Sequence, residues 1–191
     1  MNISLGATRR SWLIAAASAI GGTAVGASTA HAASAGRINN DADQALALLY
    51  RVQPKARDVA KSARAILVFP KIVKAGLIIG GQSGDGALRV GGKTVGYYNL
   101  SAASFGLQAG GQVFSYALFF MTGSSLQFLQ NSDGWAIGSG PSVVVVDKGA
   151  AASITSTTLT QDVYAFPFGQ RGLMAGIGLE GSKITHIHPG P

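Results

Sequence analysis

The pattern of hydrophobic and polar residues changes at Arg64. Upstream, apolar residues between Ala42 and Tyr50 recur near helical spacing, and a second helix is predicted over residues 55–63. Pro54 separates the two helices, because proline ends a helix or occupies its first turn. Downstream, short runs of β-branched and aromatic residues alternate with glycines, which is typical of antiparallel β-structure.

The most apolar short run, residues 65–69, predicts a buried strand. Pro70 lacks a backbone donor and keeps the preceding residue extended, so we expect this strand to stop or bend there and a second strand to begin at Ile72. Glycines 80, 81, 84 and 86 are then expected to form a turn.

Glycines 91 and 92 are expected to form a hairpin, as are residues 147–149. Ser124 is expected to cap a short helix over 125–130. Further strands are predicted at 87–90, 94–100, 105–121 with a bend at 110–111, 135–138, 143–147, 152–157, 162–166, 173–179 and 183–188.

These elements predict an α+β fold that is mainly antiparallel β. Two short N-terminal helices and one small internal helix accompany the strands, which form a curved sheet, a sandwich or a partly closed barrel. The strand order stays open, because the pattern of residues does not show which strands pair.

Residues 1–32 have the pattern of an export signal. Arg9 and Arg10 precede a short apolar stretch, and Ala30-His31-Ala32 fits a cleavage site. Paired arginines at this place indicate twin-arginine export. The apolar stretch is shorter than the roughly 20 residues that a membrane-spanning helix needs. We therefore expect an exported protein, periplasmic or secreted, that lies at most peripherally on the membrane.

The remaining chain is expected to form one domain. Residues 33–40 are small and polar and predict a disordered lead, while the folded domain is expected over 41–191, its first helix capped by Asn40 or Asp41. The chain contains no cysteine, which excludes disulfides, thiol chemistry and cysteine-based metal sites. Its 15 lysines and arginines outnumber its 8 aspartates and glutamates, and that excess favours acidic partners.

The sequence offers little to build an active site. It has no nucleophile elbow, no His-Glu-x-x-His motif and no phosphate loop, and its few carboxylates are widely separated. The glycine run at 80–86 enters no helix, so it does not fit a dinucleotide site. His186 and His188 share a strand face and could bind a metal, but no nearby Asp, Glu or Cys completes a ligand set. We expect no enzyme, no cofactor and no nucleic-acid partner, since basic and aromatic residues do not interleave.

Several motifs in order resemble the SYLF-domain family. They are Ala-Ile-Leu-Val-Phe-Pro-Lys-Ile-Val-Lys-Ala-Gly at 65–76 and the glycine-rich segments at 80–88, 104–112, 137–141 and 172–181. The resemblance covers nearly the whole chain after the signal, although the end at 186–191 lacks the tyrosine-rich tail usual in the family. It implies a lipid-binding module of a bacterial exported type. Eukaryotic members bind phosphoinositides and some bind actin, and the actin role is not expected to extend to an exported protein.

Clustered cations are the candidate lipid contacts. Six basic residues lie within 55–74, opposed by Asp58 alone, and Arg57, Lys61 and Arg64 fall at a spacing that gives one helical stripe. The segment 166–171 combines two phenylalanines with an arginine in a Pro/Gly context that suits a membrane-interface loop. Other aromatics, such as Tyr98 and Phe119, are expected in the core. The predicted lipid-binding residues are Arg57, Lys61, Arg64, Lys71, Lys74, Phe168 and Arg171.

Two functions follow from these observations. The first is an exported module that docks on anionic phospholipid head groups in the cell envelope. The second is a structural or interaction protein of the envelope that binds protein or glycan without lipid specificity, in which case the basic stripe is an ordinary solvated helix face.

Overall fold

The computed structural model describes residues 34–76, 79–105, 110–146, 159–172, 179 and 181–190. They belong to one compact unit, Ala32–Pro191, and form three helices and eight strands in the described part of the chain. The helices are α1 (Ala35–Val52), α2 (Lys55–Ser62) and α3 (Gly123–Asn131). The strands are β1 (Ala65–Gly76), β2 (Ile79–Val90), β3 (Lys93–Phe105), β4 (Gly110–Phe120), β5 (Trp135–Ala136), β6 (Val143–Val145), β7 (Val163–Gly172) and β8 (Lys183–Ile187).

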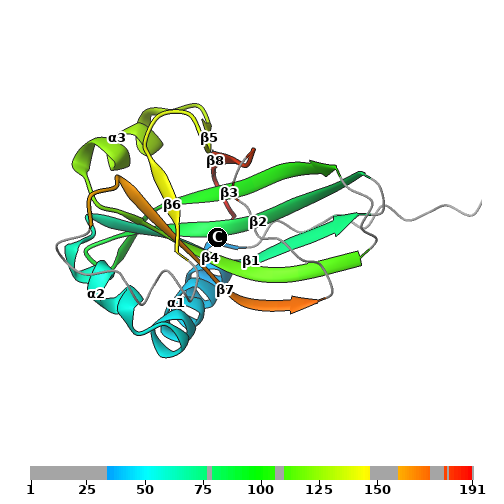
Figure 1. Cartoon of the computed structure of the whole chain (residues 1–191), viewed down its shortest axis with the longest axis horizontal. Helices are drawn as coiled ribbons and strands as arrows, with labels where there is room; N and C mark the ends of the chain where they lie inside the picture. The colour runs from blue at the N-terminus through cyan, green and yellow to red at the C-terminus, as the bar shows by residue number, and fades with distance from the viewer. Residues whose placement is uncertain are drawn as a thin grey trace, which may run out of the picture. The chain divides into compact units, whose positions relative to one another are not determined.

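The described strands form a single sheet in the order β5-β8-β3-β2-β1-β4-β7-β6. Neighbouring strands are antiparallel except for β6 and β7, which run parallel. The sheet is curled into a half-barrel (Figure 1). The predicted α+β class with mainly antiparallel strands is therefore confirmed, and the arrangement is the partly closed barrel.

Each face of the sheet carries its own apolar cluster, because successive strand residues point to opposite sides. Helices α1 and α2 cover one side, here called the helix face (Figure 1). Its core contains Ile38 and Leu49 of α1, Val59 of α2 and the strand residues Val68, Phe119 and Phe166. The other side, here called the inner face, packs around α3 and β5 through Leu67, Phe69, Tyr116, Phe120, Leu129 and Trp135.

The first helix begins earlier than the sequence predicts. Ser34 caps α1, its hydroxyl accepting a hydrogen bond of 3.4 Å from the Arg37 backbone nitrogen. The added first turn buries Ile38 against the sheet, which stabilises helix in place of the disordered lead expected at 33–40. Pro54 stands at the start of α2, as predicted. Thr122, not Ser124, caps α3, since its hydroxyl accepts from the Ser125 backbone nitrogen at 3.2 Å.

Strand β1 does not stop at Pro70. Its register with β4 shifts between Phe69 and Ile72, so Pro70 and Lys71 form a bulge inside one long strand. The Ser115 hydroxyl donates a hydrogen bond of 2.7 Å to the Pro70 carbonyl, which satisfies an acceptor that the bulge takes out of the ladder. Proline bends this strand without ending it, because both neighbouring strands resume pairing from Ile72 or Val73 onward.

The glycines predicted as a turn at 80–86 lie instead inside β2. Two of them face the bulge of β1. A Cβ added to Gly86 would stand 2.5 Å from the Val68 carbonyl oxygen and 2.6 Å from the Phe69 ring, so only glycine fits. Close approach of two strands, and not a reversal of the chain, explains this glycine run.

The hairpin predicted at glycines 91 and 92 is confirmed. Both residues have positive φ, 56° and 80°, and they join β2 directly to β3. Of the strand predicted over 105–121, Phe105 is the end of β3 and residues 110–120 form β4, while 106–109 lie outside the described residues. The predictions at 147–149, 152–157 and 173–178 lie outside the described residues. Among the described residues, no helix combines the length and the hydropathy that crossing a bilayer requires.

Candidate functional site

Four exposed cations lie together at α2 and the residues after it. Lys55, Arg57 and Lys61 project from α2, and Arg64 follows the end of the helix at Ser62, so the predicted stripe is only partly helical. Arg57 lies over the Tyr50 ring, its guanidinium carbon 5.4 Å from the ring centroid. We call Lys55, Arg57, Lys61 and Arg64 the α2 basic group.

One acidic residue accompanies this group. Asp58 accepts a hydrogen bond of 2.9 Å from the Lys61 ammonium, and both side chains are exposed. That hydrogen bond, more than the charges around it, lowers the pKa of Asp58. An exposed ion pair of this kind holds its partners weakly, because water competes for both charges. Lys61 therefore remains available to an anionic surface.

The other predicted cations do not join the α2 basic group. Arg64 and Lys74 lie at opposite ends of β1, roughly 30 Å apart along an extended strand. Lys74 pairs with Gln112 and shares the inner face with Ile72, whereas Arg171 pairs with Val113 on the helix face. Lys71 is exposed in the bulge. The single patch predicted from the sequence is wrong, because the register of β1 separates its members and places them on different sides.

Phe168 is buried and does not lie at the surface. Its side chain is 3% exposed and packs in the helix-face core, and Phe166 beside it is fully buried. The segment that was predicted to be a loop is part of β7, paired with β4 at Tyr116–Pro167 and Ser115–Phe168. Gln53, at the end of α1, donates a hydrogen bond of 3.1 Å to the Pro167 carbonyl. The core positions expected for Tyr98 and Phe119 are confirmed.

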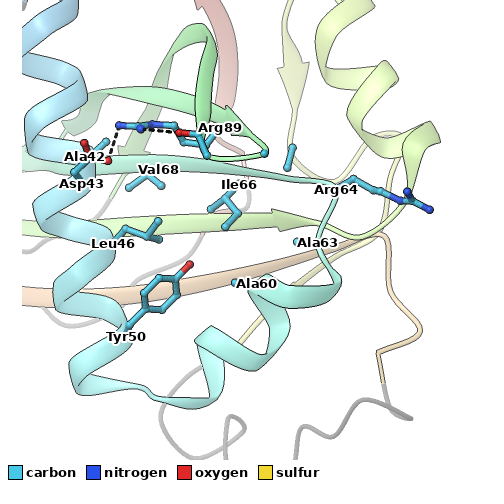
Figure 2. A pocket seen from close by; sticks show the side chains of 13 residues that line it. Ala42, Asp43, Leu46, Tyr50, Ala60, Ala63, Arg64, Ile66, Val68 and Arg89 are labelled. Carbon is cyan, nitrogen blue, oxygen red and sulfur yellow. Dashed lines mark hydrogen bonds and ion pairs between the residues drawn. The ribbon is translucent and has the colours of Figure 1, made fainter.

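A pocket of about 330 Å³ lies between α1, α2 and the sheet. Its walls are mostly apolar, with Leu46 from α1, Ala60 from α2, and Ile66 and Val68 from β1 (Figure 2). Arg64 marks one end, and its guanidinium points away from the other lining side chains (Figure 2). The residue pattern does not indicate this pocket, because its walls come from three elements whose packing that pattern does not define.

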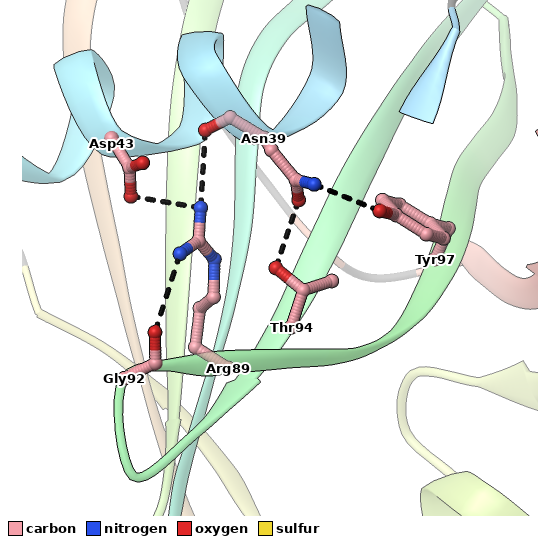
Figure 3. A network of polar contacts seen from close by, with 6 residues as sticks. All are labelled: Asn39, Asp43, Arg89, Gly92, Thr94 and Tyr97. Atoms are coloured by element: carbon pink, nitrogen blue, oxygen red, sulfur yellow. Dashed lines mark hydrogen bonds and ion pairs between the residues drawn. The ribbon is translucent and has the colours of Figure 1, made fainter. Parts of the chain in front are cut away.

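Two polar side chains reach the pocket from its walls. Burial raises the pKa of Tyr50, and the Arg57 charge only partly opposes this, so the hydroxyl stays protonated and able to donate at neutral pH. Arg89 of β2 lines the opposite end from Arg64. Its guanidinium donates to Asp43 at 2.8 Å and to the Asn39 carbonyl at 3.1 Å (Figure 3).

This arginine belongs to a polar network that ties α1 to the hairpin between β2 and β3. The Asn39 amide donates to the Tyr97 hydroxyl at 2.9 Å and accepts from the Thr94 hydroxyl at 2.8 Å (Figure 3). Sequence reasoning missed Arg89 and Asp43. The alternation of residues along β2 could have indicated Arg89. It lies two residues after the buried Ala87, so both face the helices. An arginine on that side needs an anionic partner.

The C-terminal histidines make an aromatic group with Tyr98. The rings of His186 and His188 are 4.6 Å apart, and His186 lies edge-on to Tyr98 at 5.1 Å. Within the described part of the chain, no group of three or more His, Cys, Asp or Glu side chains is placed to hold a metal. The pair thus has no third ligand among these residues.

Part of the chain matches a known protein family. Residues 101–188 match the family model described as Ysc84, Las17-binding protein actin regulator, which represents the SYLF domain. The match agrees with the resemblance to the SYLF-domain family found in the sequence. SYLF domains have lipid-binding or actin-related binding roles. No curated protein matches the chain.

The matched residues cover only part of the described fold. The match begins in β3 and ends at β8, whereas β1 and β2 form the middle of the sheet. The α2 basic group and most of the pocket walls also lie before residue 101. The candidate site is therefore built largely from the part of the domain that precedes the family match.

Proposed function

We propose that this SYLF domain docks on anionic phospholipid head groups in the cell envelope through the α2 basic group. The observation that carries the proposal is the exposure of four cations within residues 55–64, opposed there by Asp58 alone. The proposed contact surface lies at one end of β1. Phe168, Lys71 and Lys74 lie outside it. Binding, and not catalysis, is the proposed role.

The expected strength of docking follows from the charges. A lysine or arginine next to an anionic membrane contributes about 1 kcal/mol. With Asp58 offsetting one of the four cations, the group supplies roughly 3 kcal/mol, or about a hundredfold preference for anionic over neutral vesicles. Screening shortens the range of the attraction from about 10 Å at 0.1 M salt to about 3 Å at 1 M, so docking should be lost at high salt.

Vesicle co-sedimentation tests this docking. The purified protein is expected to pellet with vesicles that contain phosphatidylglycerol or cardiolipin and to stay in solution with phosphatidylcholine vesicles. The triple variant Arg57→Glu, Lys61→Glu, Arg64→Glu should weaken pelleting by at least about a hundredfold, since three attractive contacts become repulsive.

A matched control separates local charge from net charge. Lys93→Glu, Arg171→Glu and Lys183→Glu together change the net charge by the same amount, but these exposed residues lie outside α2. This control should keep most of the binding. Equal loss in both triple variants, or equal pelleting with neutral vesicles, would contradict docking through the α2 basic group. That result would favour the second function, an interaction protein, in line with a family whose name describes Las17 binding.

We also propose that the protein is exported, to the periplasm or beyond, after removal of residues 1–32. The support is the order of paired arginines, apolar stretch and Ala-x-Ala site in the sequence. Replacing Arg9 and Arg10 with lysine should leave the protein uncleaved in the cytoplasm of a bacterial host, while the unaltered chain yields a mature form that begins at Ala33. Fractionation with N-terminal sequencing measures both outcomes. Normal maturation of the twin-lysine variant would show that the paired arginines are not the export signal.

A further inference from the structure

Two exposed histidines lie side by side at the end of β8. His186 is the penultimate residue of the strand and His188 follows its last residue, and both side chains are exposed. Alternate residues of an extended chain point to the same side of the sheet. Ile184, two residues before His186, is buried in the inner-face core. The strand therefore runs from the core to solvent and presents both imidazoles on the inner-face side.

The backbone is attached to the rest of the domain before and after this pair. β8 pairs with β3 as far as Ile187, and His186 stands opposite Tyr98 in that ladder. After the pair, the Gly190 carbonyl accepts a hydrogen bond of 2.9 Å from the Ala35 backbone nitrogen at the start of α1. The two histidines thus lie between two backbone attachments, which limits the cost of ordering them around a ligand.

The distance between the two rings is that of two imidazoles on one metal ion. Their centroids lie 4.6 Å apart, with 63° between the ring planes. Imidazoles bound to one ion at about 2.0–2.1 Å, at angles from 90° to tetrahedral, place their ring centres roughly 4.4–5.3 Å apart. Because both side chains are exposed, each can rotate to direct one nitrogen at a shared ion without disturbing the core.

The neighbouring residues of β3 favour this arrangement. A Cβ added to Gly96 would stand 3.6 Å from His186 Nε2, so glycine keeps the space beside that nitrogen free of a side chain. The Tyr98 ring lies edge-on to His186 at 5.1 Å and is itself only 3% exposed. This fixed ring restricts the orientations of the His186 imidazole and so lowers the entropy that ligand binding costs.

The donor atoms select a late transition-metal ion. Imidazole nitrogens suit copper, zinc and nickel, whereas calcium and magnesium take oxygen ligands. In the described part of the chain, no third His, Cys, Asp or Glu joins the pair. Two nitrogens with water in the other positions suit the tetragonal geometry of Cu²⁺, which also binds most tightly among the divalent ions of its row.

We propose that His186 and His188 together bind one Cu²⁺ ion, with water in its remaining coordination positions. The ion is exchangeable, because two protein ligands hold it less firmly than the three or four of catalytic and structural metal sites. The site lies at the end of β8 and contains no residue of the α2 basic group, so it does not depend on membrane docking.

Titration of the full chain with Cu²⁺, without an added histidine tag, tests this site. One equivalent should bind, and electron paramagnetic resonance should show splitting from two imidazole nitrogens. Zn²⁺ should bind at least about tenfold more weakly, as the order of divalent ions requires. Tighter binding of Zn²⁺ than of Cu²⁺, or a spectrum without two nitrogen donors, would overturn the proposal.

Three variants test whether both histidines are needed on one side of the strand. His186→Ala and His188→Ala should each weaken Cu²⁺ binding by at least about tenfold, because the second imidazole no longer closes onto a bound ion. Thr185→His combined with His186→Ala keeps the number of histidines but places one on the opposite side of β8. This variant should bind as weakly as His186→Ala. Full affinity in it would contradict a site that needs the shared side.

His31→Ala is the matched control, since the sequence has three histidines and this is the third. It should leave the affinity for Cu²⁺ unchanged. Equal losses in His31→Ala and His186→Ala would show that copper does not bind at the end of β8. Vesicle pelleting of His186→Ala should match that of the unaltered protein, so the copper site and membrane docking succeed or fail separately.

Discussion

Replacing Phe168 with alanine is expected to lower the free energy of unfolding by about 3–5 kcal/mol. The ring lies in the helix-face core, 3% exposed, so its removal opens a cavity between β7 and the helices. In a domain of this size the loss corresponds to a fall of roughly 6–20 °C in melting temperature. Thermal and urea unfolding, followed by circular dichroism, measure both quantities.

Vesicle binding separates this prediction from a role at the membrane. At temperatures where Phe168→Ala is still folded, it should pellet with anionic vesicles as well as the unaltered protein does. Phe128→Ala serves as the control for loss of an aromatic ring, because Phe128 is 39% exposed and should contribute clearly less to stability. A Phe168→Ala variant with unchanged stability but impaired pelleting would restore the interfacial role that the sequence suggested.

Gly86→Ala is expected to destabilise the protein by about 3 kcal/mol, at the upper end of the effects of overpacking. The added methyl group would stand 2.5 Å from the Val68 carbonyl oxygen, and backbone atoms cannot move aside by changing rotamer. The strain falls between β1 and β2, in the middle of the sheet. Urea unfolding should show a lower midpoint with the same dependence of free energy on denaturant.

Gly81→Ala is the matched control in the same strand. A Cβ there would meet only the Ala102 carbonyl oxygen, at an ordinary 3.5 Å, so the alanine fits. Alanine also loses less backbone freedom on folding, and the variant should be neutral or more stable by about 0.5–1 kcal/mol. Similar losses at both positions would show that the close approach of β1 and β2 is not what requires glycine at Gly86.

Residue periodicity predicted the elements in which buried and exposed side chains follow a regular spacing. Alternation and helical spacing gave both N-terminal helices, the α+β class and most strand positions in the described chain, and the glycines at 91 and 92 gave the hairpin. The glycines at 80–86 misled because a residue without a side chain shows no alternation, whether it turns or packs closely. Pro70 and Pro167 suggested a strand end and a loop, but both lie within strands. A strand tolerates the missing proline donor at a bulge or where that position has no partner.

The candidate site was predictable only as far as it is local in sequence. The exposed cations at 55–64 follow one another in the chain, so their grouping survives in the structure. Lys74 and Arg171 were assigned to the same surface. Strand register decides which side of the sheet each one faces, and the residue pattern did not show how the strands pair. Arg89 and its pocket depend on three elements packing together, which the residue pattern left undefined.

The order of the strands has a consequence for synthesis on the ribosome. Strands β1 to β4, made first, occupy the middle of the sheet, while β7 and β8, made late, cover its two flanks. A nascent chain that ends before residue 163 leaves β3 and β4 with unpaired backbone groups, which invite association with other chains. These two strand edges therefore stay open to association until β7 and β8 have been made.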